Sequence, residues 1–329
     1  MDYLLGLIVL LTKITAMLGG LLLAASYLVW LERKLLARLQ VRLGPNRAGT
    51  FGLLQPIADA VKLLCKEDIV PDAADGLIFR LAPAVVAVTA MLMFAVVPLG
   101  PDIQLFGHSV PMVVSDLNVG LLYVFALSSL GVYGVALGGW ASNSKFALLG
   151  GIRGAAQMIS YELSLGLSLV PVVMLAGSFS LTAIVDAQTR MPFIVLQPVS
   201  FAIFVISAMA ESKRIPFDLP EAENELGAGF HMEYSGMRFG LFFLGEYVHI
   251  QVLGALTAVF FLGGGHRPLL PPVVWLLIKI FTVAVIMIWV RGTLPRLRYD
   301  QLMALGWKVL IPASLINIVL TGVFIQMVH

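Results

Sequence analysis

Six acidic side chains crowd one stretch of the sequence, Ala210 to Gly240. This stretch lies between two apolar runs, 193–210 and 239–262, that are typical of membrane spans. A carboxylate at the edge of a bilayer is costly unless it is neutralised or used, so such groups are candidates for function. The chemistry that suits them is proton handling or the binding of a polar redox ligand. The six are Glu211, Asp218, Glu221, Glu223, Glu225 and Glu233.

Prolines and glycines predict the local structure of this acidic stretch. Pro216 and Pro220 disfavour a helix between them. Pro220 suits the first position of a short new helix that ends near Gly227. On that helix Glu221 and Glu225 share a face, so we expect at least one pKa in the cluster to be raised and the group to titrate as a coupled unit. A solvated acidic loop is the alternative, which the apolar residues scattered among the carboxylates disfavour.

Two further carboxylates lie inside other apolar runs. Glu162 follows Tyr161 just inside the run 155–177, and Glu246 lies one or two turns into the run after the acidic stretch. With Glu211, they are expected at the same side of the membrane, which favours a buried proton route. For each one alone, pairing with an arginine or capping of a helix is the alternative.

Composition predicts a membrane protein. Of the 329 residues, 59% are hydrophobic and 12% are charged, whereas a soluble domain has about 25% charged residues. Continuous apolar runs of roughly 20 residues predict helices that cross the bilayer. We therefore expect an all-α, polytopic integral membrane protein with about eight spans in a single domain, 1–329. The runs are 3–30, 78–98, 115–139, 155–177, 193–210, 239–262, 273–291 and 308–327.

The distribution of Lys and Arg predicts the orientation. Of the 21 such residues, 17 lie in or beside the loops after the odd-numbered spans, and only Arg190 and Arg267 lie in the other loops. By the positive-inside rule, the odd loops are cytoplasmic and both termini face outward. The two cytoplasmic segments of interest are then the loop 31–77 and the acidic loop 211–238. The first apolar run is too long for a signal peptide and is expected to be a retained span.

The loop 31–77 contains a basic first part, a turn and an amphipathic segment. Gly44, with the proline that follows it, breaks any helix there. From 51 to 66, apolar residues recur at helical spacing, while Asp59 and Lys62 lie on another stripe. Such a helix lies in the membrane interface. It is either a surface anchor or one wall of a pocket for an amphipathic, membrane-borne substrate whose polar head meets Asp59 or an arginine.

Several kinds of chemistry find no support in the sequence. Cys65 is the only cysteine, so the chain cannot ligate an iron–sulfur cluster alone or form an internal disulfide. Electrons, where they are involved, must come from another subunit. The five histidines show no paired metal spacing, so no metal site is predicted. The net charge of +2 gives no indication of nucleic acid.

Long, ungapped motifs then resemble those of one known family. They are Glu32-Arg33-Lys34, LGPNRAG at 43–49, LLQPIADAVKLLCKED at 53–68, ISYE at 159–162 and the whole of 210–240. Together they resemble the quinone-site membrane subunit of respiratory complex I over nearly all of the chain. The resemblance implies an all-helical subunit of a proton-translocating NADH:quinone oxidoreductase. It also implies a place in the bacterial cytoplasmic membrane and no activity of the subunit alone.

The resemblance further implies ligands and partners. Quinone is expected at the interface with peripheral-arm subunits that hold iron–sulfur clusters. NADH, FMN and the clusters are expected only in other subunits. Neighbouring membrane-arm subunits and lipids complete the partners, and nucleic acid is not among them.

Residue roles follow from the matching positions. Glu162, Glu211 and Glu246, with Tyr161 beside the first, match the start of the proton path. Asp218, Glu221, Glu223, Glu225 and Glu233 match the acidic loop beside the quinone cavity. Arg33, Arg42 and Asp59 match the residues that line or close the quinone chamber, and Lys62, Arg214 and Phe230 complete the predicted quinone-binding set. Asn224 and the pair His231-Met232 depart from the usual motif and are expected to tune the loop.

Two alternatives accompany this interpretation. One is the corresponding membrane subunit of a membrane-bound hydrogenase or formate hydrogenlyase, which the fit of 221–236 disfavours. The other is a stand-alone proton-coupled transporter, which favours inverted repeats around a midplane site. A transporter is active alone, whereas a complex I subunit is not.

Overall fold

The protein is mainly helical, with very little strand. The computed structural model describes residues 2–105, 108–266 and 270–328. In this part of the chain, seven helical segments are long and apolar enough to cross a membrane. One antiparallel hairpin of three-residue strands, β1 (Ile103–Leu105) and β2 (His108–Val110), lies outside the helices. The expected all-α, polytopic architecture is therefore confirmed.

The long apolar segments follow one another along the chain and are joined by short helices. The long ones are α1 (Asp2–Leu39), α3 (Gly76–Met93) with η2 (Phe94–Val96), α4 (Gly120–Ala141), α5 (Lys145–Ala176), α10 (Gly236–Phe261), α11 (Pro272–Thr293), and the run of α12 (Tyr299–Ala304), the π-helical η4 (Leu305–Leu310) and α13 (Ile311–Val328). The short ones are η1 (Thr50–Gly52), α2 (Gln55–Cys65), α6 (Leu181–Ala187), α7 (Phe193–Leu196), α8 (Pro198–Glu211), α9 (Glu223–Leu226) and η3 (Gly229–His231).

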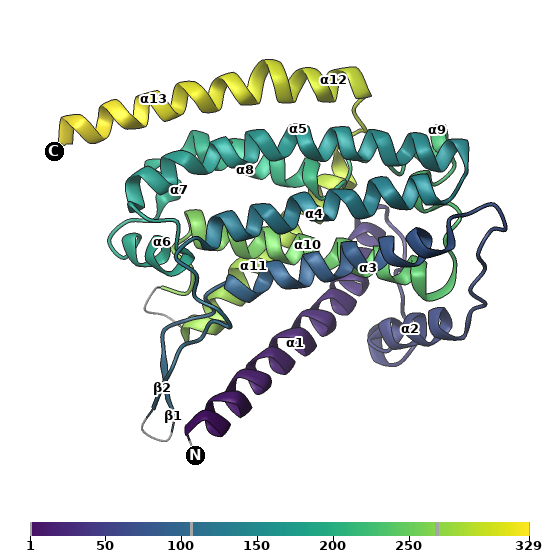
Figure 1. Ribbon diagram of the computed structural model, residues 1–329, viewed down its shortest axis with the longest axis horizontal. Coiled ribbons are helices and arrows are strands. Elements are labelled where there is room, and N and C mark those ends of the chain that lie inside the picture. Colours follow the sequence, from purple (N-terminus) through teal and green to yellow (C-terminus); the bar gives the residue numbers. More distant parts are fainter. Residues whose placement is uncertain (1, 106–107, 267–269, 329) are drawn as a thin grey trace.

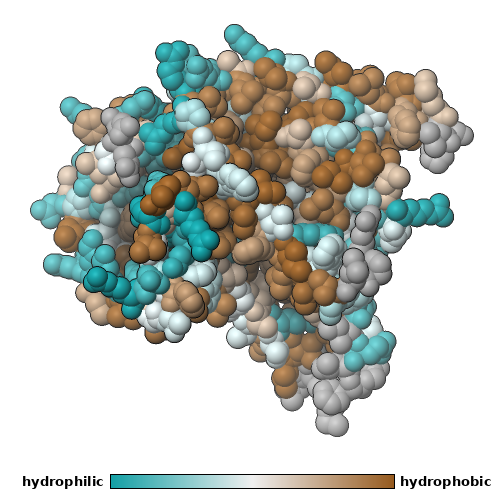
Figure 2. Space-filling view, turned by 180° about the vertical axis from the view of Figure 1, so that it is seen from behind, coloured by the Kyte–Doolittle hydropathy of each residue, from teal (hydrophilic) through white to brown (hydrophobic). Residues whose placement is uncertain are grey.

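The helices separate the molecule into two ends. The two termini and the β hairpin lie toward one end, and α2 and α9 lie toward the other (Figure 1). Seen from behind, most of the surface is hydrophobic, and hydrophilic side chains gather mainly at the edge that holds α2 and α9 (Figure 2). A broad apolar surface with polar groups collected at one end is what a protein embedded in lipid requires.

The apolar run 193–210 is interrupted. Gln197 has the non-helical torsions φ −132° and ψ 57°, and Pro198 begins α8 immediately after it. The 14 residues of α8 extend about 21 Å at the rise of an α-helix, less than the hydrocarbon core of about 30 Å. Glu211, the last residue of α8, is therefore buried within the protein rather than exposed at a membrane surface.

The helix α5 begins at Lys145, ten residues before the expected start at 155. Its first turns contain glycines that permit close packing: a Cβ on Gly151 would lie 3.2 Å from the carbonyl oxygen of Ala136 in α4. Small residues at such contacts let helix backbones approach closely in membranes. Glu162 therefore lies near the middle of α5 and not just inside its first turns, which corrects the expected position.

The acidic loop forms less helix than expected. The predicted helix from Pro220 is reduced to the single turn α9, Glu223–Leu226, in which the amides of Glu225 and Leu226 bond to the carbonyl of Ala222. Glu221 precedes that turn, so the expectation that Glu221 and Glu225 share a helix face was wrong. The physical reason is the chain reversal at Gly229, which has φ +65° and whose position leaves no room for a Cβ beside the carbonyl of Pro220.

Candidate functional site

A groove opens between α1, α2 and α10. It has a volume of about 470 Å³ and a mainly apolar lining. The predicted amphipathic helix is present as α2 and supplies one wall of the groove. The lining includes Leu22, Ala25, Val29, Arg33, Asp59, Lys62, Leu63, Gly240, Phe243 and Tyr247.

Polar side chains lie at one part of this groove. The Nη1 of Arg33 is 2.6 Å from the Oδ2 of Asp59, and the Nε2 of Gln55 donates to the Oδ1 of Asp59 at 2.9 Å. Lys62 lines the groove as well. Arg42 is not among the residues that line the groove. Its exposed side chain donates to Gln40 at 2.7 Å instead. The groove thus combines an apolar wall with a charged pair.

Tyr247 connects the groove to a buried ion network. Its ring lines the groove, and its hydroxyl donates to Glu32 at 2.8 Å. Arg214 donates to both carboxylate oxygens of Glu32, each at 2.9 Å, and Arg291 also donates to Glu32. On its other side, the Nε of Arg214 is 2.5 Å from Glu246. These bonds join α1, the start of the acidic loop, α10 and α11 below the groove.

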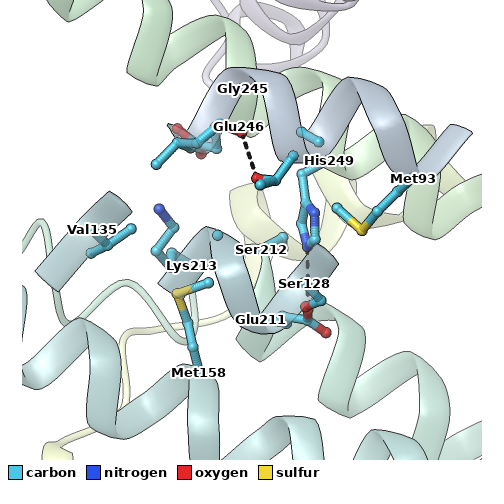
Figure 3. A pocket seen from close by; sticks show the side chains of 14 residues that line it. Met93, Ser128, Val135, Met158, Glu211, Ser212, Lys213, Gly245, Glu246 and His249 are labelled. Atoms are coloured by element: carbon cyan, nitrogen blue, oxygen red, sulfur yellow. Dashed lines mark hydrogen bonds and ion pairs between the residues drawn. The ribbon is translucent and has the colours of Figure 1, made fainter. Parts of the chain in front are cut away.

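Glu246 also lines a small cavity. Its volume is about 30 Å³, which suffices for about one water molecule. Figure 3 shows His249 directed from α10 toward Glu211 and Ser128, with Lys213 extending from the end of α8. The Nε2 of His249 is 3.7 Å from Glu211, and Ser128 donates to Glu211. The predicted residues Glu211 and Glu246 therefore line one cavity.

Glu162 lies on α5, next to the helices that line this cavity. The hydroxyl of Ser129 in α4 donates to Glu162 at 2.5 Å, and Glu162 is half-buried. Its neighbour Tyr161 is fully buried and donates to the carbonyl of Leu302 at 2.8 Å. Glu162 is close enough to Glu211 for their charges to interact. Tyr161 instead packs against the loop, with its ring centre 5.8 Å from that of Phe217.

Three carboxylates of the acidic loop each have a separate partner. Asp218 pairs with Arg296 at 2.8 Å, and Glu225 pairs with Arg153 at 2.6 Å. Glu221 faces the Nδ1 of His231 at 3.9 Å. The side chain of Glu223 lies outside the described part of the structure. Glu233 is half-buried, and within the described part of the chain it forms no ion pair.

Burial shifts the acid–base behaviour of the loop. It raises the pKa of Asp218, although the charge of Arg296 opposes the shift. Burial raises the pKa of Glu221 to about 8, and repulsion from Glu246 is the second largest cause of this shift. Burial lowers the pKa of His231 to about 4, and repulsion from Lys213 is the second cause of this shift. At neutral pH the facing pair Glu221 and His231 is therefore mainly uncharged.

A buried polar side chain that the sequence analysis did not select holds the loop in place. The amide nitrogen of Gln157 donates to the carbonyls of Ala210 and Phe217, both at 2.7 Å, and so fixes the turn between them. Phe230 is buried with its ring centre 5.2 Å from that of Phe242. Gln157 lies in a mainly apolar stretch, and such a polar residue is the one signal that points to it.

The comparisons with known proteins agree with this arrangement. Residues 12–322 match the model of the family described as NADH dehydrogenase. The chain belongs to this family. A relative from Syntrophobacter fumaroxidans, named as one of the subunits of NADH-quinone oxidoreductase, is 76% identical over 97% of each chain. Relatives from Syntrophotalea carbinolica and Geobacter metallireducens, with corresponding names, are 61% and 64% identical over 98% and 95% of each chain.

The NADH dehydrogenase family assignment covers the groove and the carboxylate cavity together. The matched residues include α2, the acidic loop, α5 and α10. Among the described residues, no group of three His, Cys, Asp or Glu side chains is arranged to hold a metal ion.

Proposed function

We propose that this chain is the membrane subunit of a proton-translocating NADH-quinone oxidoreductase and that it acts only within the complex. Family membership supports this function, because the relatives are named as subunits of NADH-quinone oxidoreductase and align over almost their whole length. The single domain, 1–329, is then a multi-pass protein of a bacterial inner membrane, with 31–77 and 211–238 on the cytoplasmic side.

The groove between α1, α2 and α10 is proposed to be a large part of the quinone chamber. A quinone carries a polar head on an apolar tail, and the lining combines apolar side chains with the Arg33–Asp59 pair. Ligand sites of this kind are mainly apolar, with a few polar groups that fix orientation. The observation that carries the proposal is Tyr247, which lines the groove and bonds to Glu32.

The ion network below Tyr247 is proposed to transmit the result of quinone reduction. A reduced quinone takes up two protons, and this change of charge alters the protonation of nearby desolvated carboxylates. From Glu32 the contacts continue through Arg214 to Glu246, which lines the cavity of Glu211. Glu162 then lies next along the path toward the rest of the membrane arm.

Electrons are proposed to come from partner subunits. The chain has one cysteine, Cys65, and one thiol cannot hold an iron–sulfur cluster alone. NADH, FMN and the clusters therefore belong to other subunits, which meet this chain beside the groove. Neighbouring membrane subunits and lipids cover the exposed apolar faces.

The variant Asp59→Ala tests the quinone chamber. Removing the carboxylate leaves Arg33 without its partner at the groove, so the quinone head is held less well. We expect quinone reduction by the intact complex to fall about tenfold, which corresponds to about 1.4 kcal/mol. Oxidation of NADH by a soluble artificial acceptor stays at the wild-type rate, because that acceptor bypasses this subunit.

A matched control is Asp300→Ala, which removes the carboxylate of an exposed Asp–Arg pair with Arg298. Both activities of that variant are expected to equal those of the wild type. Equal loss of the two activities in assembled Asp59→Ala complex would place the damage upstream of quinone and contradict the proposed chamber.

A further inference from the structure

His249 in α10 has a buried ring nitrogen that faces a carboxylate. Figure 3 shows the ring directed from α10 toward Glu211 and Ser128. The Nε2 atom is buried, and in the described part of the chain it makes no direct hydrogen bond. Its distance to the Oε1 of Glu211 is 3.7 Å, which is longer than a hydrogen bond. Buried polar atoms in native proteins normally have a hydrogen-bond partner, so this nitrogen requires a physical explanation.

The small cavity beside His249 accounts for the long distance. Its volume of about 30 Å³ suffices for about one water molecule, and a buried water makes about two to four hydrogen bonds. Polar partners are present, because His249, Glu211 and Ser128 all line the cavity. Polar groups separated by more than about 3.5 Å are often bridged by water. A water molecule in this cavity can therefore bridge the Nε2 of His249 and the carboxylate of Glu211.

The same cavity connects His249 to the ion network below the groove. Glu246, which is paired with Arg214, lines the cavity and precedes His249 by three residues on α10. Residues three apart on a helix are neighbours on one face. The contacts that begin at the groove therefore reach a cavity that is also lined by a histidine and by a second carboxylate, Glu211.

We propose that His249 is a proton-transfer residue that exchanges a proton with Glu211 through one water molecule in this cavity. In one direction, the carboxyl group of Glu211 releases a proton to the water, and the water passes one of its protons to Nε2. The products are a carboxylate, an imidazolium ion and a water molecule, and the reverse step restores the starting state. No electron moves and no further reactant is needed.

An imidazole suits this exchange for two reasons. Its unperturbed pKa lies near neutral pH, and the neutral ring has one nitrogen that can accept a proton. A step of this kind links Glu211 to the cavity side of the network that contains Glu246. The inference rests on the proposed function, because quinone reduction is the event that sets the protons in motion.

The charged and titratable groups around the ring are few. Among the residues that line the cavity, they are Glu211 at the end of α8, Lys213 just after it, and Glu246 on α10 itself. The lining residues from α3, α4 and α5 carry no group that titrates near neutral pH. Of the three groups, Glu211 is the one that an ion-pair distance joins to His249, so it is the partner for the exchange.

His249→Gln tests the exchange in the intact complex, with assembly verified on a native gel. Glutamine keeps hydrogen-bonding groups but takes up no proton at neutral pH. We expect turnover at saturating quinone and proton pumping to fall together by about tenfold or more. The KM for quinone stays at the wild-type value, because no described residue lines both this cavity and the groove. His266→Gln is the matched control, at a histidine whose side chain is 40% exposed, and it keeps wild-type turnover.

A double variant separates proton transfer from packing. Residues that act as a unit have non-additive effects on turnover. The complex that carries both Glu211→Gln and His249→Gln is therefore expected to turn over no more slowly than the slower of the two single variants. A packing role for His249 predicts instead that the two losses multiply, because independent changes in free energy add.

Gly131→Ala tests the water. Gly131 of α4 lines the cavity, and a Cβ built there lies 3.4 Å from the Oγ1 of Thr89, an ordinary contact. The added methyl group takes up cavity volume, so we expect turnover to fall several-fold. Gly166→Ala is the matched control, because a Cβ on Gly166 of α5 lies 3.7 Å from the ring of Phe125 and Gly166 does not line the cavity. Its turnover is expected to equal that of the wild type.

Wild-type turnover and pumping in assembled His249→Gln complex overturn the proposal, and so do losses that multiply in the double variant. Wild-type turnover in Gly131→Ala contradicts an exchange through water in this cavity. Where His249→Gln does not assemble, His249→Asn repeats the comparison with a smaller side chain. Absence of quinone-linked turnover in the wild-type complex is a different result, since it contradicts the proposed function itself.

Discussion

Glu32 is the residue on which the buried network below the groove depends. It accepts hydrogen bonds from Tyr247, Arg214 and Arg291. Removing one member of a buried ion pair costs about 3–5 kcal/mol, because the remaining charge stays buried. We therefore expect Glu32→Ala to lower the melting temperature of the purified complex and the yield of assembled complex on native gels.

The exposed pair of Arg298 and Asp300 provides the comparison for that prediction. Its side chains are 76% and 67% exposed, and exposed pairs contribute about 0–1 kcal/mol. Asp300→Ala is expected to leave the melting temperature within about one degree of the wild type. If Glu32→Ala were equally harmless, the network would have no structural role.

Glu221 gives the loop a dependence on pH. Its pKa is raised to about 8 in the folded protein by burial, from an unperturbed value of about 4.3. Between these values the folded state holds the proton that the unfolded state releases, so stability falls as pH rises. The slope is at most about 1.4 kcal/mol per pH unit, and it ends above the folded pKa.

Hydrogen exchange of the amides in 210–240 measures this effect locally. We expect protection of the loop to decrease from pH 6 to pH 8 in the wild type, after correction for the intrinsic exchange rate. In Glu221→Gln the decrease in protection is smaller, because the glutamine side chain does not titrate. Identical pH dependence in the two proteins would show that Glu221 does not titrate in this range and would contradict the prediction.

At the scale of elements, the contact between α2 and α10 sets the width of the groove. A Cβ on Gly240 of α10 would lie 3.1 Å from the Cδ1 of Leu63 in α2. We expect Gly240→Val to push α2 outward and to raise the KM for a long-tailed quinone several-fold. Steady-state kinetics of the intact complex measure this change.

Gly20 in α1 is the matched control, because nothing lies within 4 Å of a Cβ built there. Gly20→Val is expected to leave the KM unchanged. An unaltered KM in Gly240→Val would mean that the groove is wider in the complex or that quinone enters elsewhere.

The elements differ in how far the sequence predicts them. Long apolar runs and the helical spacing of 51–66 predicted the spans and α2, because burial in lipid imposes those patterns. The interruption at Gln197 and the early start of α5 were not predicted. The interruption depends on the backbone conformation of the single residue Gln197, and the early start of α5 depends on glycines that pack against α4.

The candidate site was predicted in its residue types but not in its partners. Carboxylates inside apolar runs are conspicuous in the sequence, so Glu162, Glu211 and Glu246 could be selected. The partners of the network come from distant positions: Glu32 and Arg214 are 182 residues apart. No local spacing reports such a contact, and only packing of the helices brings the two together.

At the scale of the whole molecule, the orientation of the bundle remains a prediction with a direct test. Cysteines at 143 and 299 are expected to react only with reagent on the cytoplasmic side, because the positive-inside rule places both loops there. A cysteine at 186 serves as the outward-facing comparison. The experiment requires a Cys65→Ser background, because Cys65 is itself exposed. Labelling of residue 143 from outside intact cells would mean that the bundle has the opposite orientation. Each carboxylate would then lie on the other side of the membrane from the one assigned.

The central claim is that buried carboxylates couple quinone reduction at the groove to proton movement in the membrane. Glu211→Gln tests it most directly, because it keeps the shape of the side chain and removes its titration. The measurement is proton pumping by proteoliposomes, recorded together with NADH:quinone turnover, with Asp72→Asn as an exposed control. We predict that pumping and turnover of Glu211→Gln fall together by about tenfold or more, while oxidation of NADH by an artificial acceptor is unchanged. Wild-type turnover with an undiminished proton gradient would contradict the account and leave Glu211 with a packing role.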